Sequence, residues 1–271
     1  MSILSTMMIT TITAPNGVAT ITLNRPEIRN ALNPQMIEEL ISTLQRMIKD
    51  PQVRVIQLRG EGKIFCAGAD MNWMRSMANY TFDENVSDAA RLATLFETID
   101  DCPKPILILV QGGAYGGGVG LVAACDIAIA TDMASFCLSE VRVGILPAVI
   151  SPYLIQAIGE RQTRRFTLTA ECFDAQESHR IGLVHHVVPE NELEATAQSI
   201  IEQILKGSLQ AQSAAKKLFK DLKLTATQED RRRITTTAIA QARSSPDGQE
   251  GLQAFLSKRE PQWYDSQKTP K

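Results

Sequence analysis

Residues 106–120 are ILILVQGGAYGGGVG, an apolar β-rich run that passes into a cluster of glycines. The chain continues as LVAA over residues 121–124, a small-residue pattern typical of a helix. Glycine lets the backbone approach a ligand closely, and the first turn of a helix leaves several N–H groups without partners. We therefore predict a strand, a tight turn and a helix start whose main-chain donors hold an oxygen that gains negative charge. Such a site fits acyl or thioester chemistry, or phosphate binding.

The segments around this stretch alternate between strand and helix patterns. Asn16-Gly17 predicts a hairpin turn, and Asn33-Pro34 predicts the start of a helix with an apolar face. A polar stretch over residues 79–85 precedes a helix predicted around residues 88–100, and residues 174–182 predict a short capped helix. β-rich runs predict strands at residues 8–13, 18–23, 53–58, 106–110, 126–130, 134–138 and 183–188.

From Glu192 onward the pattern is helical throughout. We therefore predict the α/β class, with a core over residues 1–191 that is followed by an all-α region over residues 192–271. A chain of 271 residues with this apolar content is long enough to bury a full core.

The overall charge and the cysteine pattern exclude several classes of protein. A net charge of -2 does not favour nucleic-acid binding, and only a local basic patch would remain for it. No apolar run approaches the roughly 20 residues of a membrane helix. The first residues lack the pattern of a targeting segment, and the five cysteines are scattered without a CxxC pair. We therefore expect a cytoplasmic protein with reduced thiols.

Several motifs of other enzyme classes are missing. The dinucleotide pattern GxGxxG is broken, since Gly116 and Gly118 are followed by Leu121. Lys63 is followed by Ile64 rather than Ser or Thr, which excludes a phosphate-binding Walker A loop. No GxSxG occurs, so the usual serine-hydrolase signature is absent. No metal-ligand spacing emerges, and we expect structural roles for the three histidines: His179, His185 and His186.

A set of motifs in a fixed order runs through nearly the whole chain. They are LNRP (23–26), NALN (30–33), FCAGAD (65–70), QGGAYGGG (111–118), ACDIA (124–128), FCLSE (136–140) and EGLQAFLSKR (250–259). Together they resemble the enoyl-CoA hydratase/isomerase (crotonase) family. The resemblance implies a spiral of ββα turns over residues 1–191 and a helical trimerisation region over residues 192–271. It further implies a homotrimer or a hexamer built as a dimer of trimers.

The resemblance also assigns roles to residues. The two backbone N–H groups of the family's oxyanion hole fall on Ala69 and Gly117, where they would hold the thioester carbonyl as it becomes an enolate. The coenzyme A part of the substrate would lie against two segments of the chain. The residues implied there are Arg29, Ala31, Ala67, Asp70, Met71 and Asn72. No metal and no cofactor other than this substrate coenzyme A is implied.

The acid–base residues depart from the family pattern. Hydratases of this family commonly use two glutamates, and the second matches Glu140. The first falls on Gly120, which has no side chain. Paired carboxylates can hold and polarise water for hydration, whereas a single carboxylate can move a proton between two carbons, as in 3,2-enoyl-CoA isomerases. Hydration and isomerisation therefore both remain open. A non-catalytic CoA-binding protein is a third alternative, but Glu140 argues against it, because an inactive protein needs no carboxylate at this position.

The run of residues 137–152, CLSEVRVGILPAVISP, lacks the usual glycine-rich stretch after Pro147. In this it resembles a bacterial subgroup assigned to the hydration of methylglutaconyl-CoA or carboxygeranoyl-CoA. A carboxylate on such a substrate would help to position water, and we expect Gly120 to leave room for it. Arg142 is the candidate cation to meet this carboxylate. The sequence thus predicts an enoyl-CoA hydratase for branched or carboxylated substrates, with an isomerase as the alternative.

Overall fold

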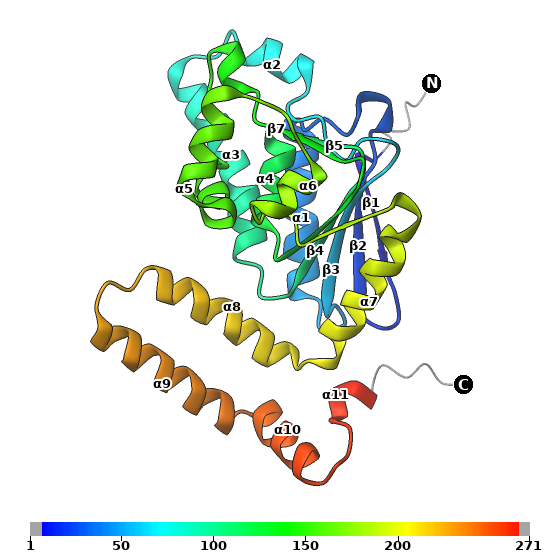
Figure 1. Cartoon of the computed structure of the whole chain (residues 1–271), viewed down its shortest axis with the longest axis vertical. Helices are drawn as coiled ribbons and strands as arrows, with labels where there is room; N and C mark the ends of the chain where they lie inside the picture. Colours follow the sequence, from blue (N-terminus) through cyan, green and yellow to red (C-terminus); the bar gives the residue numbers. More distant parts are fainter. Residues whose placement is uncertain (1–6, 266–271) are drawn as a thin grey trace.

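The computed structural model describes residues 7–265. Its main sheet has six strands in the order β1-β2-β3-β4-β6-β9. Figure 1 shows β1 to β4 side by side in this sheet. Only β1 and β2 are antiparallel, joined through the Asn16-Gly17 turn, in which Gly17 has φ of 85°. The strands are β1 Ile9–Thr13, β2 Val18–Leu23, β3 Val55–Gly60, β4 Ile106–Val110, β6 Ile127–Thr131 and β9 His186–Val188.

A second, three-stranded sheet contains β5 (Gly113–Tyr115), β7 (Ser135–Cys137) and β8 (Phe173–Asp174). The chain leaves β4, forms β5 and then enters helix α4 (Gly117–Ala124), and it passes from β6 to β7 in the same way. These two turns each add one strand to each sheet, as in the predicted ββα spiral, whereas β3 and β9 add a strand to the main sheet alone.

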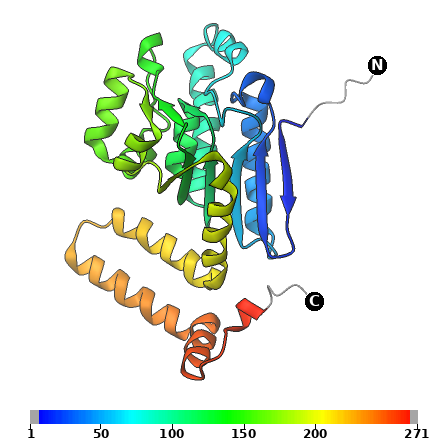
Figure 2. The same ribbon diagram turned by 45° about the vertical axis from the view of Figure 1, so that its right-hand side comes forward.

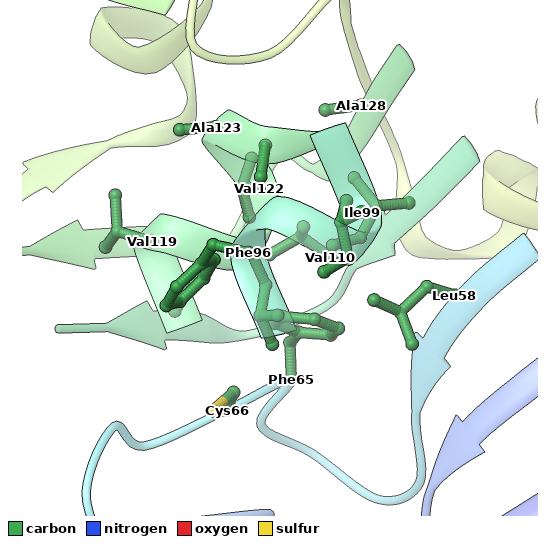
Figure 3. Packing of buried hydrophobic residues seen from close by; sticks show 14 of the residues in the cluster. Leu58, Phe65, Cys66, Phe96, Ile99, Val110, Val119, Val122, Ala123 and Ala128 are labelled. Atoms are coloured by element: carbon green, nitrogen blue, oxygen red, sulfur yellow. The ribbon is translucent and has the colours of Figure 1, made fainter. Parts of the chain in front are cut away.

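Helices cover both faces of the main sheet. Ile106, Ile108 and Val110 of β4 pack into the larger core with Phe96 of α3 (Phe82–Asp100) and with α4 (Figure 3). Leu107 and Leu109 point to the other face, where α7 (Leu193–Lys206) packs. Burial on both faces explains why β4 is apolar at every position, as strands of parallel sheets are.

The remaining helices differ in part from the prediction. Helix α1 (Pro34–Lys49) begins as predicted, and the Asn33 side chain accepts a hydrogen bond from the Met36 N–H. Helix α3 begins at Phe82, within the stretch predicted to be polar loop, because Thr81 and Glu84 form a capping box there. The helices without an individual prediction are α2 (Met71–Met77) and α5 (Ser151–Thr169). Helix α6 spans Ala175–Arg180, and one-turn 3-10 helices cover Pro26–Ile28, Glu140–Val143 and Glu190–Glu192.

The last helices extend away from the sheets (Figure 2). They are α8 (Leu209–Lys223), α9 (Gln228–Ser244), α10 (Pro246–Leu256) and α11 (Gln262–Asp265). An ion pair of 2.6 Å between Lys216 and Asp126 connects α8 to the core. Helix α7 lies beyond residue 191 but packs on the main sheet. The domain boundary that the sequence predicts between residues 191 and 192 stays a prediction.

Within residues 7–265, no helix has both the length and the apolar character that crossing a membrane requires.

We predict that Asn30→Ala lowers the free energy of unfolding by about 3 kcal/mol or more. Asn30 is fully buried at φ of 54°. Its Oδ1 accepts from the N–H of Arg25, and its Nδ2 donates to the carbonyls of Glu61 and Ile64, each at 2.9 Å. The alanine would leave buried backbone groups without partners, and it would disfavour the positive φ. Urea unfolding at fixed protein concentration measures the change.

The matched control is Asn79→Ala, since Asn79 is exposed and makes one side-chain hydrogen bond. This control should stay within about 0.5 kcal/mol of the unsubstituted protein. Equal urea midpoints for the two variants would contradict the clamping role of Asn30.

Candidate active site

The loop after β3 joins the second sheet by backbone pairing. The N–H of Cys66 donates to Gly113 O at 3.1 Å, and the N–H of Tyr115 donates to Cys66 O at 2.9 Å. Gly68, at φ of 87°, lies against Tyr115, and an ideal Cβ there would stand 2.9 Å from the Tyr115 carbonyl oxygen. Because only glycine permits this approach, the loop lies directly beside the turn that leads into α4.

The predicted oxyanion donors lie at this junction. Ala69 is exposed, and a backbone hydrogen bond holds the residue on each side of it. The Leu32 N–H donates to Gly68 O, and the Asp70 N–H donates to Leu32 O. Gly117 is the first residue of α4, where N–H groups lack intrahelical partners. Within residues 7–265, neither the Ala69 N–H nor the Gly117 N–H donates to another group of the chain. Both donors are therefore available to a ligand oxygen, and their joint use stays a prediction.

Glu140 lies against the same turn. Its Oε1 would be 3.1 Å from an ideal Cβ at Gly116, whose φ is 50°, so glycine leaves room for this carboxyl group. The Gly116 N–H donates to Cys137 O at 3.0 Å and thereby fixes the turn to the end of β7. The Oε2 of Glu140 is buried without a hydrogen-bond partner in the described residues, and burial raises the pKa of this carboxyl group. A half-buried acid with an unused oxygen is suited to proton transfer.

The space beside Gly120 is filled, and the expectation that it admits a substrate carboxylate is wrong. An ideal Cβ at Gly120 would stand 2.3 Å from Ile150 Cγ2 and 3.0 Å from Phe96 Cε1. Both side chains are buried, so an apolar wall occupies the place of the family's first glutamate. Neither Ile150 nor Phe96 could be identified from the sequence, because only the packing of α3 and α5 on α4 brings them to Gly120.

Two segments predicted to bind coenzyme A lie side by side. The Ala67 N–H donates to Arg29 O at 2.9 Å, which places residues 29–31 next to residues 67–72. Arg29 and Asn72 are exposed, Ala67 is half-buried and Ala31 is buried. Met71 is 69% exposed at the start of α2, which is unusual for a large apolar side chain and leaves it free to contact a ligand.

The Asp70 carboxylate is already bound within the protein. It accepts a hydrogen bond of 2.7 Å from the Asn72 N–H at the start of α2, and it pairs with Arg25 at 2.9 Å. Burial alone would raise the pKa of Asp70, but these N–H and guanidinium partners outweigh it and lower the pKa. The side chain of Asp70 therefore orders the loop, and any contact with coenzyme A would come from its neighbours.

Arg142 is two residues after Glu140 and is exposed. Among the described residues it forms no ion pair, and its charge acts on the nearby Cys137 thiol. The histidines have structural contacts: His185 Nδ1 accepts from the Ala128 N–H at 3.1 Å, and His179 Nδ1 lies 3.3 Å from Val184 O. No cluster of metal-binding side chains occurs in residues 7–265.

Comparisons with known proteins give consistent results. The model of the enoyl-CoA hydratase/isomerase family matches residues 13–267. The crystal structure of an enoyl-CoA hydratase from Shewanella pealeana has 42% sequence identity and a TM-score of 0.91, covering 94% of this chain and 96% of that one. An enoyl-CoA hydratase structure from Mycobacterium smegmatis has 30% identity and a TM-score of 0.89, covering 95% and 99%. The Xenopus laevis protein named enoyl-CoA hydratase domain-containing protein 3, mitochondrial, is 31% identical over 259 residues, which are 95% of this chain and 87% of its own.

These similarities extend over both sheets and the C-terminal helices. They confirm the predicted α/β fold and the predicted class of enzyme, a hydro-lyase of the enoyl-CoA hydratase type. The chain belongs to the enoyl-CoA hydratase/isomerase family.

Proposed function

We propose that this enzyme adds water across the 2,3 double bond of an acyl-CoA thioester with Glu140 as its single acid–base carboxylate. The observation that carries the proposal is the position of Glu140. Its carboxyl group lies against Gly116 through Oε1 and keeps Oε2 without a partner, while Ile150 and Phe96 exclude a second carboxylate at Gly120. One group therefore has to accept a proton and return it.

The reaction proceeds in two steps. The ionised Glu140 accepts a proton from water as the water oxygen bonds to C3 of the substrate, and the electron pair of the double bond moves onto the thioester oxygen. The N–H groups of Ala69 and Gly117 hold the resulting enolate oxygen, which typically contributes a few kcal/mol per donor. Protonated Glu140 then gives its proton to C2, and the thioester carbonyl re-forms. Both steps balance: the hydroxyl group of the water ends on C3, and its proton passes through Glu140 to C2.

The acyl chain that we propose is branched or carboxylated, as in 3-methylglutaconyl-CoA. Large apolar side chains are exposed near the site, on α2 and after Glu140, and they fit a branched chain: Met71, Met74, Val143, Ile145 and Leu146. Arg142 is the cation closest in sequence to Glu140 and fits a terminal carboxylate. This assignment also rests on the resemblance of residues 137–152 to the methylglutaconyl-CoA subgroup.

We further propose that α8–α10 form the contacts of a homotrimer or a dimer of trimers. A cavity of about 720 Å³ lies between these helices and is lined by Leu218, Ile234 and Leu252 among others. Phe219, Leu224, Phe255 and Leu256 are each more than half exposed, which a protein normally avoids for large apolar side chains.

An isomerase is the second candidate, because moving a double bond requires only one carboxylate. Gly120 favours it, since the paired-glutamate arrangement for polarising water is absent. The mass of the product distinguishes the candidates: hydration adds one water, and isomerisation leaves the mass unchanged.

We predict that crotonyl-CoA and 3-methylglutaconyl-CoA each gain one water with this protein, and that Glu140→Gln lowers kcat by about 10²–10⁴-fold. The amide is nearly isosteric but cannot accept the proton from water, so coenzyme A binding should be retained. Loss of the conjugated thioester absorbance measures turnover, and calorimetric titration measures binding.

Glu177→Gln is the matched control, because Glu177 is an ion-paired residue on α6. This control should retain full turnover. Equal activity of the two variants would rule out Glu140 as the acid–base group. Movement of the double bond of a 3-enoyl-CoA without a change in mass would instead establish the isomerase.

We predict that kcat/KM falls as the pH is lowered through a value above 4.5, the ordinary pKa of a glutamate. Burial raises the pKa of Glu140, so below that value the carboxyl group holds a proton and cannot accept one from water. A pH–rate profile with crotonyl-CoA measures the acid limb. The residual activity of Glu140→Gln should lack this acid limb. If the limb persists in the variant, it arises from the titration of another group.

We predict that Arg142→Ala raises KM for 3-methylglutaconyl-CoA about tenfold or more, as loss of a charge-assisted hydrogen bond does. The KM for crotonyl-CoA, which has no terminal carboxylate, should change little. Arg161→Ala, a change of the same type on α5, serves as the control. An unchanged ratio of the two KM values would refute this role of Arg142.

A further inference from the structure

Two cysteines face each other where β7 and β8 pair. The strands are antiparallel, with Ser135 opposite Asp174 and Phe136 opposite Phe173. The rings of Phe136 and Phe173 stack with centroids 5.5 Å apart, so the side chains of this register meet. Continued by one residue, the same register places Cys137 opposite Cys172. Side chains that face each other in this way have Cβ atoms within about 1–2 Å of the separation in a disulfide.

The two thiols differ in exposure and contact each other. Cys137 is buried, and its Sγ donates to Ala170 O at 3.4 Å, whereas Cys172 is exposed. Burial, together with the direct interaction with the Cys172 thiol, raises the pKa of Cys137 to about 12. An accessible thiol thus lies against a buried one, the arrangement of an attacking and a resolving cysteine.

The pair is attached to the active site through the backbone. The Cys137 carbonyl oxygen accepts the Gly116 N–H at 3.0 Å, and Glu140 follows three residues later. The segment between the two cysteines contains Glu140, Ile150 and all of α5. A covalent link would therefore close a loop around this side of the site.

We infer that Cys137 and Cys172 form a reversible disulfide that lowers turnover, with a low-molecular-weight disulfide as the oxidant. The Cys172 thiolate attacks one sulfur of the oxidant, breaks its S–S bond and releases one thiolate. Cys137 then loses its proton and attacks the sulfur of Cys172, which releases the second thiolate. Two protein thiols are oxidised, and one external disulfide is reduced to two thiols.

The loss of turnover follows from geometry. A disulfide holds its sulfurs at about 2.05 Å and its Cβ atoms near 3.8 Å, so its formation draws Cys137 toward β8. The hydrogen bond from Gly116 to Cys137 O and the position of Glu140 then shift. A displacement of about 1 Å in a catalytic arrangement can lower the rate about 10²-fold.

The test uses the full-length protein, reduced and then incubated with oxidised glutathione. We expect intact-mass analysis to show the loss of two hydrogen atoms, and peptide mapping to show Cys137 linked to Cys172. Hydration of crotonyl-CoA should fall about tenfold or more, and dithiothreitol should restore it. Cys125→Ser is the control and should respond like the unsubstituted protein, because Cys125 lies on neither strand of the pair.

Two further variants separate the steps. Cys172→Ser changes an exposed side chain, and its turnover should become insensitive to oxidised glutathione. Cys137→Ser removes the resolving thiol, so a mixed disulfide with glutathione should remain on Cys172. The inference is overturned if the two cysteines stay unlinked after oxidation, or if the linked protein turns over as fast as the reduced one. Neither result bears on the proposed role of Glu140, which the reduced protein tests.

Discussion

Gly68 lies so close to Tyr115 that an ideal Cβ would stand 2.9 Å from the carbonyl oxygen. This approach brings the loop after β3 to the first turn of α4, and the site is assembled around it. Ala69 follows Gly68, and Gly117 follows the turn, so one contact places both free N–H groups at one junction. Glu140 depends on the same turn, because the Gly116 N–H fixes the end of β7 from which its segment continues.

The rest of the protein gives this junction a rigid base. The strand β4 is buried on both faces, by α3 and α4 on one side and by α7 on the other. Four buried side-chain atoms of the described residues have no hydrogen-bond partner, and the Oε2 of Glu140 is the only carboxylate oxygen among them. Burying such an oxygen is costly, and stability lost at one position is a common accompaniment of catalytic function.

Much of the fold could be predicted from local signals, since the apolar run of β4 and the capped start of α1 depend on neighbouring residues. The sequence pattern places the start of helix α3 too late, because the polar residues of its first turn, capped by Thr81, resemble a loop. The contact of Ile150 with Gly120 could not be predicted, because it arises only when α5 packs on α4. The roles of Ala69, Gly117 and the residues expected to bind coenzyme A rest on family resemblance, and they stay predictions.

The wall beside Gly120 constrains how this site can change during evolution. A single substitution that introduced glutamate at position 120 would collide with Ile150, so the intermediate protein would fold poorly before any second carboxylate could act. A smaller residue at position 150 would have to come first, and by itself it would leave a cavity in the core. A two-carboxylate site on this scaffold therefore needs coupled changes at positions 120 and 150, and the order of these changes decides how stable the intermediate protein is.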